Sequence, residues 1–349
     1  MRTSFSAHNT RLLTASVVVA LLFSACSSPV AGTPAAGTPV AIPTTIAPEI
    51  AVPTSQYNDW FRTLDPCGFV DEVTIAEWGE QRHFGNSSRM DECSIEFSQP
   101  VTDARISGLA VATGNFVNSS YSDLGGFIGY EYPDPVMCSV YVKFDEHQSF
   151  SFTAFSEDLG VMSPELFSDT YDELLCSRTK DLVRASVPLF ASQPLRSESS
   201  RTTTTKLASV QPCGAIPEFV RKYPNAVVPP LRDGQPYACT FFREKPVNGG
   251  KNERVDISFG QRPEETSEEP ATLFGHVEID VLGVVAHEDH EEDLDDYCRI
   301  DAFVGVGAGF PVHEYLGTTT YIDVISVIGL GCEPVRAAAT AAVRAYQNS

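Results

Sequence analysis

The stretch Pro66-Cys67-Gly68 recurs later in the chain as Pro212-Cys213-Gly214, and this recurrence is the first sign of a duplicated fold. Another cysteine follows 26 residues later in each case, Cys93 after the first stretch and Cys239 after the second. A third and a fourth cysteine complete each set, so eight of the nine cysteines form two matching groups of four. The spacing predicts that one folding unit is present twice.

The segment that follows the last cysteine of each group supports the duplication. Counted from Cys176 and from Cys332, matching residue pairs stand at offsets 3, 4, 7, 10, 11 and 14: Thr179 and Val335, Lys180 and Arg336, Val183 and Ala339, Ser186 and Ala342, Val187 and Val343, Phe190 and Tyr346. Such offsets describe one face of an α-helix with a basic residue beside it. Each copy is therefore expected to close with an amphipathic helix.

Strand patterns fill the space between the cysteines. The apolar residues Phe150, Phe152 and Ala154 alternate with polar ones, which is typical of a half-buried strand. The other strand candidates are Cys93–Phe97, Arg105–Ala112, a stretch opening at Cys138, Cys239–Arg243, Arg254–Phe259, Cys298–Val306 and Tyr321–Ile328; short helices are expected over Asp71–Trp78 and from Pro217 to Val220. The order predicts an α+β fold with two tandem domains, each an antiparallel sheet with helices packed on one face.

The first 25 residues resemble a bacterial export signal. Arg2 and Arg11 precede an apolar run that ends in Leu22-Phe23-Ser24-Ala25-Cys26, and a run of that length is short for a membrane span. A small residue before a cysteine resembles the lipoprotein cleavage box, in which Cys26 becomes the lipidated first residue. The alternative is ordinary cleavage nearby and release of a secreted protein.

Export favours disulfides over metal ligands for the other eight cysteines. Four cysteines in a copy allow three pairings, among which sequence alone does not choose. We favour pairing of the first cysteine with the second and of the third with the fourth: Cys67 with Cys93, Cys138 with Cys176, Cys213 with Cys239, and Cys298 with Cys332. Each bridge would contribute roughly 3 to 4 kcal/mol in the chain-entropy model.

Composition divides the mature chain. Residues 26–56 are rich in Pro, Thr and Ala and are expected to form an extended spacer. Residues 57–195 and 210–349 are the two copies, called the first copy and the second copy below. Residues 196–209 contain the run Thr202-Thr203-Thr204-Thr205 and are expected to form a flexible linker, with glycosylation of its hydroxyls as the alternative.

A family resemblance follows from these features. An export signal with a lipidation box, a Pro/Thr/Ala spacer, the motif Asp65-Pro66-Cys67-Gly68 before a short acidic helix, and Cys93 opening a strand together resemble the actinobacterial lipoproteins of the domain of unknown function 3558 family. The second copy has Gln211 where the first has Asp65, so its resemblance is weaker. The resemblance implies an envelope location and a disulfide-bonded domain, and it implies no activity.

Charge narrows the class of partners. Removing Arg2 and Arg11 with the signal leaves 24 − 2 = 22 basic side chains against 46 acidic ones, a formal balance of 22 − 46 = −24. This balance makes nucleic acid an unsuitable partner. The expected partners are a membrane, through the lipid anchor, and an envelope protein, lipid or small molecule.

Few motifs point to chemistry, and no cofactor is expected. The acidic run from His287 to Asp296 offers His287, Asp289, His290 and Asp293 as weak metal-ligand candidates, but it lacks the oxygen pattern of a calcium loop. We interpret it as a solvated acidic loop. The segment Gly305-Val306-Gly307-Ala308-Gly309 runs into Phe310-Pro311 instead of a helix, so it indicates a turn between strands and not a nucleotide loop.

Two functional classes remain at this level. The first is a non-catalytic binding or accessory protein displayed outside the membrane. The second is an envelope hydrolase that acts on wall or lipid substrates through carboxylates too dispersed to recognise, for which a pair of facing carboxylates would be the sign. The absence of a recognisable catalytic motif in the sequence favours the first class.

Overall fold

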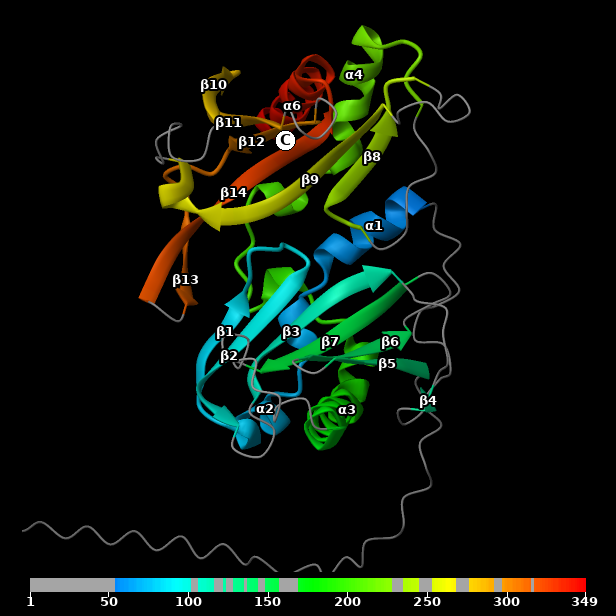
Figure 1. Cartoon of the computed structure of the whole chain (residues 1–349), viewed down its shortest axis with the longest axis vertical. Helices are drawn as coiled ribbons and strands as arrows, with labels where there is room; N and C mark the ends of the chain where they lie inside the picture. Colours follow the sequence, from blue (N-terminus) through cyan, green and yellow to red (C-terminus); the bar gives the residue numbers. More distant parts are fainter. Residues whose placement is uncertain are drawn as a thin grey trace, which may run out of the picture. The chain divides into compact units, whose positions relative to one another are not determined.

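The computed structural model describes residues 54–101, 106–115, 122–123, 128–134, 137–143, 148–156, 169–227, 235–244, 253–267, 276–291, 297–314 and 317–349. Over these ranges the chain forms two antiparallel sheets, one from each copy, and helices (Figure 1). Both sheets belong to the same compact unit. The predicted α+β class, with an antiparallel sheet in each copy, is confirmed.

The sheet of the first copy has the strand order β1-β2-β3-β7-β6-β5-β4. Its strands are β1 (Gln81–Asn86), β2 (Glu92–Val101), β3 (Ile106–Asn115), β4 (Ser122–Asp123), β5 (Ile128–Asp134), β6 (Met137–Lys143) and β7 (Gln148–Ser156). All neighbours pair antiparallel. Alternation places Phe150, Phe152 and Ala154 of β7 in the core, as the two-residue period predicts.

The sheet of the second copy has the order β10-β11-β12-β14-β9-β8, and β13 pairs with β14. Its strands are β8 (Ala238–Phe242), β9 (Arg254–Pro263), β10 (Val277–Val281), β11 (Val284–Glu291), β12 (Tyr297–Phe303), β13 (Phe310–Glu314) and β14 (Gly317–Leu330). If β2 is matched with β8 and the chain is then followed in order, β3 matches β9, β4 to β6 match β10 to β12, and β7 matches β14. Six strands thus share one topology, as a duplicated unit requires.

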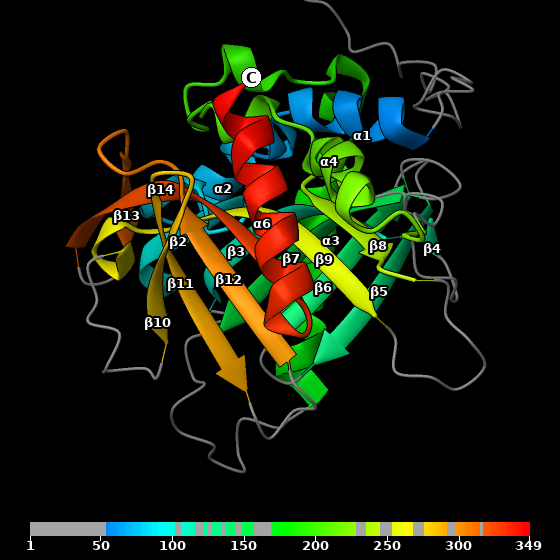
Figure 2. The ribbon, with the colours of Figure 1, turned by 90° about the horizontal axis from the view of Figure 1, so that it is seen from above.

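A helix covers one face of each sheet. In the first copy α3 (Asp169–Ser192) packs against β5, β6 and β7, and in the second α6 (Cys332–Gln347) crosses β9, β12 and β14 (Figure 2). The paired offsets predict the buried side: Val183, Phe190, Val335 and Ala339 are all fully buried. Each helix therefore seals a separate apolar core.

The short helices begin where capping chemistry allows. Asp71 caps α2 (Glu72–Trp78) by accepting a hydrogen bond from the Thr74 backbone N–H, 2.8 Å from its Oδ1. Proline stands in the first turn of α4 (Ile216–Lys222). Within α2, Ile75 and Trp78 are buried, whereas Val73 is 69 % exposed. Helix α1 (Thr54–Thr63) begins inside the segment predicted to be spacer and buries Phe61 against Phe150.

The four disulfides are those that the sequence favoured. They join Cys67 to Cys93, Cys138 to Cys176, Cys213 to Cys239 and Cys298 to Cys332. The first bridge of each copy ties the Pro-Cys-Gly turn to a strand of the same copy, which is β2 in the first copy and β8 in the second. The second bridge ties the closing helix to β6 or β12.

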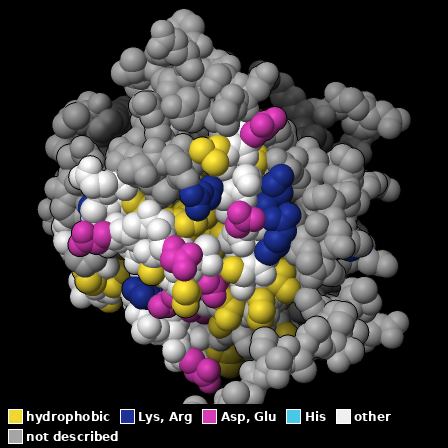
Figure 3. Space-filling view, turned by 90° about the horizontal axis from the view of Figure 1, so that it is seen from below, with side chains coloured by type: hydrophobic (Ala, Val, Ile, Leu, Met, Phe, Trp, Pro, Cys, Tyr) yellow, Lys and Arg dark blue, Asp and Glu magenta, His cyan; other side chains and the backbone are white. Residues whose placement is uncertain are grey.

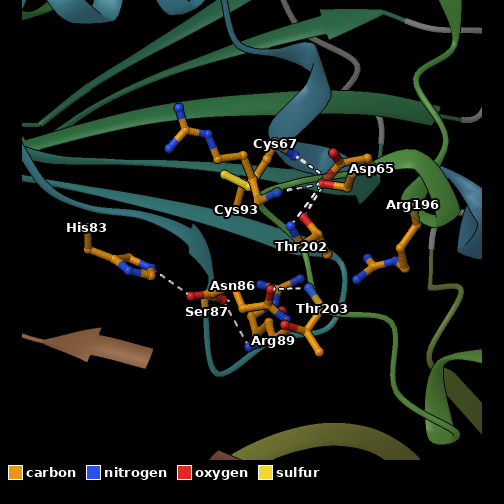
Figure 4. The surroundings of a disulfide bond; sticks show 12 residues. Asp65, Cys67, His83, Asn86, Ser87, Arg89, Cys93, Arg196, Thr202 and Thr203 are labelled. Carbon is orange, nitrogen blue, oxygen red and sulfur yellow. Dashed lines mark hydrogen bonds between the residues drawn. A yellow bond between two sulfur atoms is a disulfide. The ribbon is translucent and has the colours of Figure 1, made fainter. Parts of the chain in front are cut away.

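The segment 196–209 differs from its predicted flexible linker. It contains the short 3-10 helices η4 (Arg196–Glu198) and η5 (Leu207–Ser209), and Leu207 and Ala208 lie in the core of the second copy. Thr202 donates its hydroxyl to the Asp65 carboxylate at 2.5 Å, and the Thr203 backbone N–H donates to the Asn86 side chain at 2.6 Å (Figure 4). The polar groups that suggested a solvated linker therefore form hydrogen bonds to the first copy, and these bonds hold the segment in place.

The acidic run after position 286 also differs from its predicted loop. Residues 287–291 belong to β11 and pair with β12, from His287 opposite Asp301 to Glu291 opposite Tyr297. The glycine-rich segment 305–309 connects β12 to β13, as predicted for a turn between strands. Gly307 adopts a φ of 76°, which favours glycine, and its N–H donates to the Glu264 carboxylate at 2.9 Å.

Candidate ligand-binding site

A cavity of about 600 Å³ is lined by residues of both copies. From the first copy it is lined by Ser88, Arg89, Asp91, Ala112, Thr113, Tyr141 and Ser151; from the second, by Gln235, Tyr237, Ala238, Ser258, Phe259, Gly260, Gln261, Arg262, Val324 and Ser326. The volume falls within the range of small-molecule sites, roughly 300 to 1,000 Å³. The cavity is the candidate functional site because it brings polar groups of the two copies together.

Small polar side chains line the cavity along the strands. On β7, Ser151 alternates with the core residues Phe150 and Phe152, so it lies on the sheet face opposite α3. On β9, Ser258 alternates in the same way with Ile257 and Phe259. Strand alternation thus supplies an apolar face to each helix and a hydroxyl-bearing face to the cavity.

A fixed ion pair forms part of the wall. The Arg89 guanidinium donates from Nε and Nη2 to the two oxygens of Asp91, at 3.1 and 2.9 Å, and Thr113 donates its hydroxyl to the same carboxylate at 3.0 Å. The Asp91 charge raises the pKa of Arg89. Burial raises the pKa of Glu92 beside this pair, against a hydrogen bond from Ser87. This two-pronged pairing holds both side chains in one orientation.

The β1–β2 turn, residues 87–91, connects the copies beside this ion pair. Its Ser88 carbonyl accepts the Gln261 backbone N–H at 2.9 Å, and Arg89 forms an isolated antiparallel bridge with Gly260 of β9. Met90, also in this turn, is buried in the core cluster of the second copy. The cavity therefore has a wall whose position is set by backbone hydrogen bonds across the two copies.

The second copy supplies a guanidinium, that of Arg262. Its Nη2 lies 3.9 Å from the Asp301 carboxylate, which Arg299 contacts more closely at 2.9 Å and to which Ser326 also donates its hydroxyl. Asp301 is thus shared among several donors, and its hold on Arg262 is weak. Arg262 is 41 % exposed, so it can turn toward a bound anion.

Another arginine of the first copy, Arg62, does not line the cavity but supports the part of its wall that contains Tyr237. Arg62 is buried and donates to the Pro236 carbonyl at 2.9 Å, while the Tyr237 hydroxyl donates to the Arg62 carbonyl at 3.3 Å. Burial raises the pKa of Tyr237, so its hydroxyl stays protonated. These bonds fix the position of the Tyr237 ring in the cavity wall.

The cavity lining and the chain as a whole differ in the sign of their net charge. The whole sequence has 46 acidic residues against 24 basic ones, and on the face drawn in Figure 3 both signs are interspersed with apolar side chains. The described cavity lining, in contrast, has two guanidiniums and one carboxylate. With a single carboxylate there, the pair that a glycoside hydrolase needs is not formed by the described lining.

The structure does not bring the weak metal candidates together. His287 is buried and stacks on His276 at 4.0 Å between ring centroids, whereas His290, three residues along the same strand, is exposed on the other face. Asp289 lies half-buried between them, and Asp293 lies outside the described residues. In the described ranges one cluster of potential ligands occurs, Glu288 with Cys298 and Cys332. Its two sulfurs form a disulfide, and Arg336 binds Glu288.

Sequence reasoning missed the cavity residues. The lipidation candidate Cys26 lies outside the described residues, and the eight disulfide cysteines are structural. No helix in the described ranges is long and apolar enough to span a membrane. Scattered serines and two arginines carry no motif, and only the alternation of Ser151 and Ser258 with core residues could have indicated an unusually polar sheet face.

Comparisons with protein-family models, curated proteins and solved structures found no match.

Proposed function

We propose that this protein is an envelope lipoprotein, anchored to the outer face of the membrane through Cys26, that binds a small polar ligand without catalysis. The observation that carries the proposal is the cavity of about 600 Å³ to which both copies contribute hydrogen-bonding side chains. The four disulfides indicate a protein that folds outside the cytoplasm, where such bonds persist. The resemblance to actinobacterial lipoproteins supports the anchor.

The anchor is tested by replacing Cys26. In an actinobacterial host, the unaltered chain should sediment with membranes and yield a lipid-modified N-terminal peptide by mass spectrometry. Cys26→Ala should release the protein into the medium. If the unaltered chain is instead released into the medium, cleaved at another site and without lipid, the protein is secreted and the proposed anchor is wrong.

Binding is tested with the mature chain bearing Cys26→Ser, mixed with purified wall saccharide or with membrane-lipid vesicles and then sedimented. The filling variant Ser258→Trp places a large ring in the cavity, and we expect it to abolish co-sedimentation. Ser98→Trp is the matched control, since Ser98 is an exposed residue of β2 that does not line the cavity. Equal retention of both variants would disprove a role for the cavity.

A further inference from the structure

We propose that the cavity recognises a polyhydroxylated ring that carries one anionic group, as in an acidic sugar or an inositol phosphate. This assignment deepens the proposed binding function and rests on it. The inference comes from three properties of the lining: its local charge, its hydroxyl groups and an accessible aromatic ring.

Local charge favours an anion. Arg89 and Arg262 line the cavity with one carboxylate, Asp91, in a chain whose overall balance is strongly negative. Asp91 is already occupied by Arg89 and Thr113, while among the described residues the Arg262 guanidinium has only a distant contact, with Asp301 at 3.9 Å. Arg262 is therefore the cation best able to bind an incoming carboxylate or phosphate, and a guanidinium can hold either with two parallel hydrogen bonds.

Hydroxyl groups favour a ligand that both donates and accepts. Thr113 and Ser326 each donate their hydroxyl to a carboxylate, Asp91 and Asp301 respectively, which leaves their oxygen lone pairs as acceptors. The guanidinium N–H groups supply donors from the same wall. A ligand with several hydroxyls can satisfy both kinds of group, whereas an acyl chain would leave these polar groups desolvated without partners.

Tyr141 supplies an aromatic surface. It lies on β6 opposite Ser151 of β7, and it is half-buried on the sheet face that lines the cavity. Aromatic rings present a large apolar area with a polar end, a combination suited to the C–H face of a sugar or cyclitol ring. Ring contact on one side and hydrogen bonds at the edges would fix the orientation of such a ligand.

The test is calorimetric titration of the mature Cys26→Ser chain with four probes: glucuronate, inositol 1-phosphate, glucose and inorganic phosphate. Glucuronate represents an acidic glycan and inositol 1-phosphate a lipid headgroup, so the two arms separate the sources of the same chemistry. At least one of these two should bind about tenfold or more tightly than both glucose and inorganic phosphate. Arg262→Gln should weaken that binding about 10- to 100-fold, the loss expected for a hydrogen bond to a charged group.

Arg254→Gln is the matched control, because Arg254 lies on the same face of β9, eight residues from Arg262, and does not line the cavity. It should leave affinity unchanged. The assignment would be overturned if neither glucuronate nor inositol 1-phosphate binds more tightly than glucose and inorganic phosphate, if Arg262→Gln has no effect, or if no probe gives heat at millimolar concentration. If Ser258→Trp still abolishes co-sedimentation in that case, the binding function stands and only the ligand class fails.

Discussion

Replacing Met90 by alanine should destabilise both copies at once. Met90 belongs to the β1–β2 turn of the first copy, yet its side chain is 2 % exposed within the core cluster of the second copy, together with Phe219 and Ile257. The Arg196 guanidinium donates to the Met90 carbonyl and holds the turn in place. The side chain thus couples the folding of one copy to the integrity of the other.

The magnitude follows from burial. Truncation of a fully buried methionine to alanine costs about 2 to 5 kcal/mol, because the transfer free energy of the lost atoms adds to that of the cavity left behind. We take about 3 kcal/mol as the expected loss in the free energy of unfolding. With a guanidinium slope of roughly 2 to 6 kcal/mol per molar, the midpoint should fall by roughly 0.5 to 1.5 M.

The assay uses the position of the tryptophans. Trp60 and Trp78 are the two tryptophans of the chain, and both pack in or against the core of the first copy, so their fluorescence reports chiefly on that copy, whereas far-UV circular dichroism reports on both. The two probes should give coincident transitions that Met90→Ala shifts together. Val73→Ala is the control, since Val73 is 69 % exposed and a substitution there should change stability by at most about 0.5 kcal/mol. Separate transitions, with the tryptophan midpoint unmoved by Met90→Ala, would refute the coupling.

Three further outcomes are expected. Burial raises the pKa of Asp323 above its ordinary 3.8, against a hydrogen bond from the Leu207 N–H, so its ionisation opposes folding. The unaltered chain should therefore lose thermal stability relative to Asp323→Asn as pH rises from about 3.8 through the raised pKa, and parallel melting curves across that range would contradict this. Replacing Cys138 and Cys176 together by alanine should cost about 4 kcal/mol in the chain-entropy model for a 38-residue loop, and chemical unfolding measures the loss. Zinc titrated into the full mature chain should give no stoichiometric heat at His287 and His290, which lie on opposite faces of β11; a saturable signal lost in His290→Ala would contradict the reading.

Fold prediction succeeded where the signal is local and repeated. The offsets after Cys176 and Cys332 place the core faces of α3 and α6 correctly, because a helix face is fixed by spacing alone. The favoured pairing of first with second and third with fourth cysteine is also the one found, although the sequence left two other pairings open. The strands β1, β4, β5, β10 and β13 were missed: β4 has two residues, and β10, although its apolar residues alternate with acidic ones, has only five.

Prediction failed where partners lie far apart in sequence. Thr202 reads as part of a flexible hinge because its composition is polar, and its acceptor Asp65 stands 137 residues away. The cavity has the same property: Arg89 and Arg262 come from different copies and line one cavity only in the folded chain. Likewise residues 287–291 of β11 were predicted to be a loop, because acidic side chains have low strand propensity. Their pairing with β12, which lies beyond the acidic run, places them in the sheet.

The one departure of the second copy from the repeated motif has a physical explanation in the contacts between copies. Asp65 accepts the Cys67 backbone N–H at 3.0 Å and also the Thr202 hydroxyl, so this carboxylate both caps a turn and anchors the connecting segment. Gln211, at the matching position, donates its amide to Asp59 of α1 at 2.5 Å. An aspartate there would place two carboxylates against each other, and the amide replaces repulsion by a hydrogen bond. The two turns therefore differ at a residue whose side chain has a different neighbour in each copy: the Thr202 hydroxyl for Asp65 and the Asp59 carboxylate for Gln211.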